Sequence, residues 1–190
     1  MKTLLPVLVT VGVILAIVLI GVAIVSGTYN SMVSQSQAVD AQWAQVETQY
    51  QRRYDLIPNL VNAVKGGMAQ ERAVFDAIAE ARTRYAGAPT PDARAAAASQ
   101  VEGSLARLLV VMENYPQIRS LEAVQGLMAE LSGTENRISV ERRRFNETVQ
   151  RYNTSIKTFP TVVFAGMFGF KERAYFQSVT GAATAPKVEF

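Results

Sequence analysis

The chain of 190 residues contains no cysteine and no histidine. Their absence excludes the usual structural zinc sites, a cysteine nucleophile, and every catalytic couple that needs an imidazole. Carboxylate pairs could still support chemistry, but no Asp or Glu spacing marks an acid–base pair or a metal site, and no glycine-rich phosphate loop is present. We therefore expect a protein that is not an enzyme, with no catalytic residue, no cofactor and no metal.

A concentrated field of positive charge is also lacking. The chain has 19 Lys and Arg against 16 Asp and Glu, and setting aside Lys2 before the first apolar run leaves 18 against 16. The arginines at 142–144 are flanked by Glu141 and Glu147, as on a solvated helix face. Nucleic acid is therefore not an expected partner.

Charge is missing altogether from Leu4 to Val25, a run of 22 residues. At ~1.5 Å per residue, a helix of this length spans about 33 Å, enough to cross a hydrocarbon core of about 30 Å. The run exceeds the ~7–15 apolar residues of a signal peptide, and no clear cleavage site follows it. We predict an uncleaved transmembrane anchor over residues 1–26, with the lipid bilayer as partner.

Positive charge borders this run on one side only. Lys2 precedes it, and no Lys or Arg follows until Arg52. The positive-inside bias then predicts a single-pass protein whose N-terminus is cytoplasmic and whose remaining chain is extracytoplasmic.

Small residues recur within the run at Gly12, Ala16 and Gly21. Such spacing lets membrane helices pack closely, which favours a homo-oligomer. The alternative is that these positions pack against nothing, because small residues are common in spanning helices.

Beyond the span, apolar residues recur at alternating spacings of three and four, which is typical of helices packed lengthwise as in a coiled coil. One row runs from Tyr29 to Tyr85 and another from Leu121 to Phe159. Between them we predict a helix over about 91–112. Thr90 is its expected N-cap.

These rows predict an all-α fold, in which one N-terminal transmembrane helix is followed by an extended antiparallel bundle of three to four long helices. The bundle is expected over residues 27–178 and a flexible tail over 179–190.

Pro58 interrupts the first row. It removes a backbone donor and clashes with the carbonyl of Tyr54, so the helix either kinks there or reverses direction. The apolar register continues through Leu60 and Val64, which favours the kink. The glycines at 66–67 form a second weak point.

Four charged residues occupy seam positions in the two rows. We hypothesise that some of them pair across helices and fix the register of packing, because an unpaired charge in a seam destabilises it. They are Arg53, Glu71, Glu135 and Arg142.

The C-terminal part of the chain is dense in phenylalanine. It either folds back to plug the bundle or forms a self-association or membrane-surface patch. The candidate residues are Phe164, Phe168, Phe170 and Phe176.

Several strings occur in a characteristic order and spacing, and together they resemble the LemA family of bacterial membrane proteins over about residues 29–176. They are Trp43, RRYDLIPNLV at 52–61, GTENRI at 133–138, YN at 152–153 and FP at 159–160. The resemblance implies an anchored bundle of long helices in the bacterial inner (cytoplasmic) membrane. It implies no enzymatic activity, and it transfers no site residues. A related branch is associated with the formation of magnetosome membranes.

Two functions follow as hypotheses. The first is a membrane-anchored protein that self-assembles and scaffolds or shapes the envelope. The alternative is an anchored adaptor or signalling stalk that binds another envelope protein.

Overall fold

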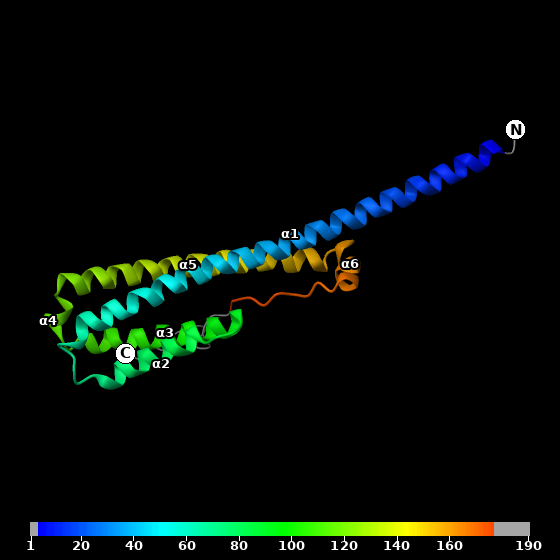
Figure 1. Ribbon diagram of the computed structural model, residues 1–190. Coiled ribbons are helices and arrows are strands. Elements are labelled where there is room, and N and C mark those ends of the chain that lie inside the picture. The colour runs from blue at the N-terminus through cyan, green and yellow to red at the C-terminus, as the bar shows by residue number, and fades with distance from the viewer. Residues whose placement is uncertain (1–3, 177–190) are drawn as a thin grey trace, which may run out of the picture. The chain divides into compact units, whose positions relative to one another are not determined.

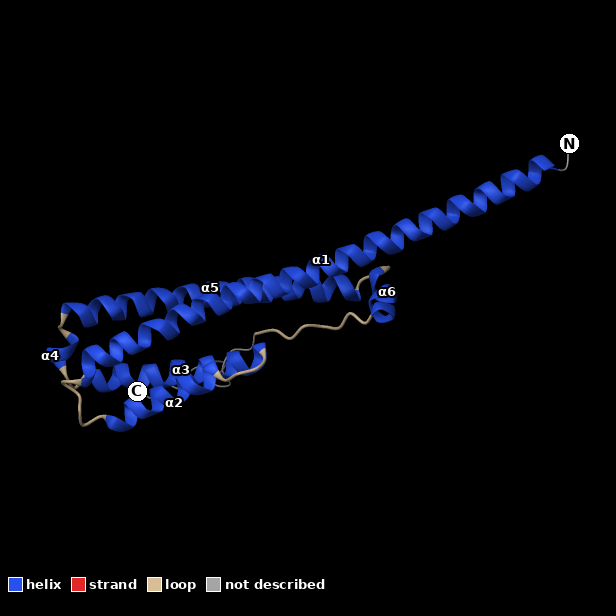
Figure 2. Cartoon of the chain, viewed as in Figure 1, coloured by secondary structure: helices blue, strands red, loops and turns tan. Residues whose placement is uncertain are grey.

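The computed structural model describes residues 4–176, and every regular element in this range is a helix (Figures 1 and 2). The expected tail at 179–190 lies outside the described residues. The helices are α1 Leu4–Lys65, α2 Arg72–Ala86, α3 Pro91–Met112, α4 Pro116–Arg119, α5 Glu122–Lys157 and α6 Thr161–Phe168.

Contacts divide the chain into two compact units. Unit 1 consists of Met1–Ala44 and Glu141–Phe190, and unit 2 consists of Gln45–Val140. Helices α1 and α5 each contribute to both units, whereas α2, α3 and α4 belong to unit 2 and α6 belongs to unit 1.

Helix α1 passes through Pro58 and ends at Lys65. The predicted kink requires a helix that continues through Pro58, as α1 does, so the alternative of a reversal there is wrong, whereas a bend at Pro58 stays a prediction. A proline inside a helix costs ~3 kcal/mol, but its neighbours Ile57 and Leu60 are fully buried, and their packing outweighs this cost.

The first row, from Tyr29 to Tyr85, is divided between α1 and α2 at the second predicted weak point. The chain leaves α1 at the two glycines 66–67, where the amides of Gly67 and Met68 both donate to the carbonyl of Val64 at 3.1 Å. Helix α2 then resumes the same apolar register. Consecutive glycines end the helix because each lowers its stability by about 1 kcal/mol relative to alanine.

The helix predicted over 91–112 is confirmed as α3. The side chain of Thr90 accepts a hydrogen bond from the amide of Ala93 at 3.2 Å, and Pro91 is the first helical residue. The row predicted from Leu121 to Phe159 lies mainly on the single long helix α5, and the short α4 precedes it between α3 and α5.

Burial follows the predicted rows within each unit. The core of unit 1 comprises Met32, Val39, Phe145, Val149, Tyr152, Ile156 and Ala165. Unit 2 buries apolar side chains from α1, α2, α3, α4 and α5, among them Val46, Ile57, Ile78, Leu108, Ile118 and Ile138. Most apolar positions of the two rows are thus buried, but the row positions Tyr29, Leu121 and Phe159 are exposed, and α3, α4 and α6 add core residues that lie outside the rows.

Candidate functional site

The first candidate site is the apolar part of α1. From Leu8 to Ile24, its large apolar side chains are 51% to 67% exposed. Among the described residues, α1 alone is long and apolar enough to cross a membrane, and no part of its most apolar stretch is buried. Apolar surface exposed to this extent favours transfer out of water.

The small residues of the predicted packing face lie on this exposed stretch. A Cβ atom added to Gly12 or Gly21 would meet nothing within 4 Å, and Ala16 is exposed. The structure therefore leaves room along α1 for a second helix, and the packing role of these residues stays a prediction.

Residues 159–176 form the phenylalanine-rich part of the chain, which we call the aromatic segment. Its helix, α6, lies beside α1 close to the end of the apolar run of α1 (Figure 1). The ring of Tyr29 meets those of Phe168 and Phe170 edge to face, with centroids 5.1 and 5.9 Å apart. Tyr29 is four residues beyond Val25, and α6 thus lies where the exposed apolar surface of α1 gives way to the packed core of unit 1.

Residues 171–176 are held against α5 by side-chain amides. Asn153 donates to the carbonyl of Arg173 and accepts from its amide, both at 2.9 Å. Asn146 makes the same pair of bonds with Phe176, at 3.1 and 2.7 Å. We call these four bonds the asparagine clamp, and it defines where the chain that follows α6 runs.

Sequence reasoning missed the asparagine clamp, although a pattern pointed to it. Asn146 and Asn153 are seven residues apart, and each follows a buried aromatic residue of the second row, Phe145 or Tyr152. A spacing of seven places both amides at the same position of the repeat, next to the buried seam.

The four candidate phenylalanines do not form one patch. Phe176 is half-buried and stacks on Trp43 at 5.9 Å, with the Arg142 guanidinium 4.8 Å from its ring centroid. Phe168 and Phe170 instead contact Tyr29, and Phe164 is half-buried. Their role as a self-association or membrane-surface patch stays a prediction.

The predicted seam charges differ in their burial and in their partners. Arg53 is 6% exposed and pairs through Nη1 with Glu102 of α3 at 3.1 Å and through Nη2 with Glu135 of α5. Glu71 instead accepts a hydrogen bond from the Tyr115 hydroxyl at 3.0 Å, which raises the pKa of that phenol. Arg53 and Glu135 are thus brought together, and their role in register stays a prediction.

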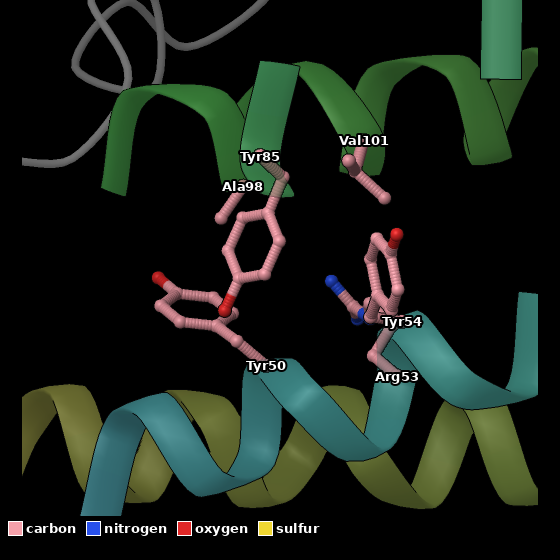
Figure 3. A pocket seen from close by; sticks show the side chains of 6 residues that line it. All are labelled: Tyr50, Arg53, Tyr54, Tyr85, Ala98 and Val101. Atoms are coloured by element: carbon pink, nitrogen blue, oxygen red, sulfur yellow. The ribbon is translucent and has the colours of Figure 1, made fainter. Parts of the chain in front are cut away.

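A small pocket lies beside Arg53, between α1, α2 and α3 (Figure 3). Figure 3 shows Tyr85 reaching from α2 toward Tyr50 of α1, and their ring centroids are 6.2 Å apart. The cavity volume of about 10 Å³ matches a single water molecule, so it is too small for an organic cofactor. Within residues 4–176, no three acidic side chains gather as a metal site.

The Tyr85 phenol of this pocket predicts a loss of stability in alkaline solution. Burial, assisted by the nearby Tyr50, Asp55 and Tyr54, raises the pKa of Tyr85 to about 12. An unfolded tyrosine has a pKa of about 10, so the unfolded chain releases this proton first as the pH rises. The contribution of Tyr85 is therefore complete below about pH 10 and declines toward about pH 12.

Urea unfolding at about pH 9 and about pH 11 measures this decline, because these values lie below and within the titration window. Tyr85→Phe is expected to lose less stability between them than the parent protein. Tyr175→Phe, at an exposed position, is the matched control and should behave like the parent. An equal decline in all three proteins would contradict the assignment to Tyr85.

These features define an α-helical protein with one candidate membrane span and a packed helical part. The family model of the LemA family matches residues 42–190, and the chain belongs to this family. The family is not known for enzymes, and together with the apolar helix it indicates a membrane-associated protein.

Three curated relatives are magnetosome proteins. "Magnetosome protein MamQ 2" and "Magnetosome protein MamQ 1" of Paramagnetospirillum magneticum are each 29% identical over 175 residues, covering 78% of this chain and 64% of each relative. "Magnetosome protein MamQ" of Magnetospirillum gryphiswaldense is 26% identical over 174 residues, with the same coverage. The chain thus spans slightly less than two thirds of the length of these relatives.

Proposed function

We propose that this protein is a non-enzymatic, single-pass membrane protein that self-assembles and scaffolds the bacterial envelope. The main observation in support of the proposal concerns α1. This one continuous helix has an exposed apolar run near its N-terminus and a row of buried seam residues farther along. Such a helix couples a packed helical domain to a bilayer without a flexible joint. A scaffold needs this coupling to transmit its own geometry to the membrane.

The proposed arrangement is an antiparallel bundle outside the cytoplasm. Hydrogen bonds join Gln35 to Ser155 at 3.0 Å and Gln42 to Glu141 at 2.8 Å, so the partners occur in opposite order along α1 and α5. Lys2 before the span, with no further cation until Arg52, supports a cytoplasmic N-terminus in the inner membrane.

The relatives support a role in organising membrane. Their names describe them as magnetosome proteins. For the present chain we infer from this only a role in organising a membrane. The open face at Gly12 and Gly21 supports association through the span, where close helix approach replaces the hydrophobic effect as the driving force.

Substitution within the span tests self-assembly. The double variant Gly12→Leu and Ala16→Leu is expected to weaken association about tenfold or more, because losing ~1.4 kcal/mol of close packing has that effect. Energy transfer between labelled copies in vesicles, at several protein-to-lipid ratios, measures the dissociation constant. Ile14→Leu with Val18→Leu is the control at the same spacing on another face of α1.

A parent protein that is monomeric in both mild detergent and vesicles would overturn the self-assembly proposal. Recovery of one foreign envelope protein in stoichiometric amount, together with a monomeric parent, would instead support the anchored adaptor.

A further inference from the structure

Helix α6 is unusual in composition for a surface element. Its sequence, TVVFAGMF, contains no charged residue, and Phe159 and Pro160 precede it. Ala165 is its only buried residue. A short helix in water normally exposes polar side chains, so this one presents an apolar surface for which unit 1 supplies no cover.

The exposed apolar side chains are large and lie close together in the sequence. Phe159 is 80% exposed and Met167 is 74% exposed, and Val162, Val163 and Phe168 are also exposed. Apolar side chains at this density mark a surface that becomes covered in the working protein.

The position of α6 indicates what covers it. Tyr29, which contacts Phe168, lies about 6 Å of helix beyond Val25, at ~1.5 Å per residue. Each headgroup layer of a bilayer is roughly 5–8 Å thick. If α1 crosses the membrane through its apolar run, α6 therefore lies at the depth of the headgroups.

The flanking residues hold α6 at this depth. On its N-terminal side α5 continues to Lys157, which pairs with Glu172 at 2.8 Å, and on its C-terminal side the asparagine clamp fixes Arg173. Arg173 also pairs with Asp40 of α1 at 3.2 Å. Charged groups thus border an uncharged helix, as in elements that lie in a membrane interface.

We propose that Phe159 and α6 form a membrane-docking element that enters the headgroup–acyl boundary of the bilayer crossed by α1. The inference rests on the proposed membrane span. The exposed surface of α6 adjoins the exposed surface of α1, so one bilayer covers both. Docking at a second point beside the span also prevents unit 1 from rotating about the axis of α1, a motion that a single spanning helix leaves free.

Fluorescence quenching in vesicles tests the proposal. The chain has no cysteine, so Met167→Cys, Leu15→Cys and Ala38→Cys each accept one environment-sensitive dye in the full-length protein. Met167 reports on α6 and Leu15 on the span. Ala38 is exposed on α1, about 20 Å beyond the apolar run at ~1.5 Å per residue, and serves as the aqueous control.

The labelled proteins are reconstituted into phosphatidylethanolamine and phosphatidylglycerol vesicles that contain a lipid with a nitroxide near its headgroup. The nitroxide lipid is expected to quench the Met167 label several-fold more than the Ala38 label. Aqueous iodide is expected to show the opposite order. Quenching of the Leu15 label by a nitroxide deep in the acyl chains verifies the span.

The outcomes separate this inference from the proposed function. If the Leu15 label is quenched but the quenching of the Met167 label equals that of the Ala38 control, the proposed span is supported and the proposed docking element is wrong. A Met167 label shielded from both quenchers means that a second copy covers α6, which also overturns the proposal. Failure of quenching at Leu15 overturns the span and the docking element together.

A charge substitution gives an independent test. Val163→Asp with Met167→Asp changes only exposed positions, so the fold should persist, as checked by circular dichroism. A dye at Phe159→Cys is expected to lose its lipid quenching in this background, because carboxylates resist entry into the interface. Unchanged quenching at Phe159 would contradict the proposal.

Discussion

Replacing Arg53 with methionine is expected to lower the free energy of unfolding by about 2–3 kcal/mol, because Glu102 then loses its partner in a partly buried site. The guanidinium is 6% exposed and is shared between Glu102 of α3 and Glu135 of α5. Methionine conserves much of the volume, so the loss reports on charge rather than on a cavity. Urea titration of the protein in detergent, followed by circular dichroism, measures the change.

Arg52→Met is the matched control at the preceding, exposed position, and it should change stability by no more than about 0.5 kcal/mol. Adding Glu102→Gln to Arg53→Met should recover part of the loss, because it removes the unpaired carboxylate. The pairing would count as energetically unimportant if Arg53→Met behaved like Arg52→Met.

Replacing Asn153 with alanine is expected to lower the free energy of unfolding by about 2–3 kcal/mol, because two hydrogen bonds of a buried amide are lost together. Asn153 is buried, and it satisfies both the amide and the carbonyl of Arg173. The segment that follows α6 should detach from α5. Hydrogen exchange at the Arg173 amide should therefore accelerate more than at amides inside α5.

Thr154→Ala changes the next, exposed residue and serves as the control for this substitution. Asn153→Asp keeps the oxygen that accepts from the Arg173 amide but loses the donor to its carbonyl, so an intermediate loss is expected. Protection of the Arg173 amide in Asn153→Ala at the parent level would show that other contacts hold the segment.

The limits of prediction from sequence are clear at the two helix-breaking points of the first row. Proline at 58 is the stronger breaker by intrinsic propensity, yet α1 continues through it and ends at the glycines 66–67. The buried neighbours Ile57 and Leu60 decide this, and their burial depends on the other helices of unit 2. Propensity therefore identified both weak points but not which of them turns the chain.

The charged seam positions show the same limit. Their spacing identified Arg53 as a residue that needs a partner, and Glu135 was among the candidates. The second partner, Glu102, was not found, because α3 has a less regular apolar pattern and its facing side follows from packing alone. In the aromatic segment, composition singled out the phenylalanines, whereas the more exposed Phe159 and Met167 became evident only from the structure.

Family membership follows from a match that extends over residues 42–190, whereas the apolar run that can span a membrane, the α-helical class and the bounds of α3 follow from shorter stretches of the amino-acid sequence. These last three features are local, since they depend on charge, spacing and capping within a few turns of helix. Tertiary packing was needed to establish that the chain turns at 66–67 rather than at Pro58, that Glu102 is a partner of Arg53, and that α6 lies beside Tyr29. Each of these depends on packing between residues far apart in the chain, which a local pattern such as the two glycines at 66–67 does not determine by itself.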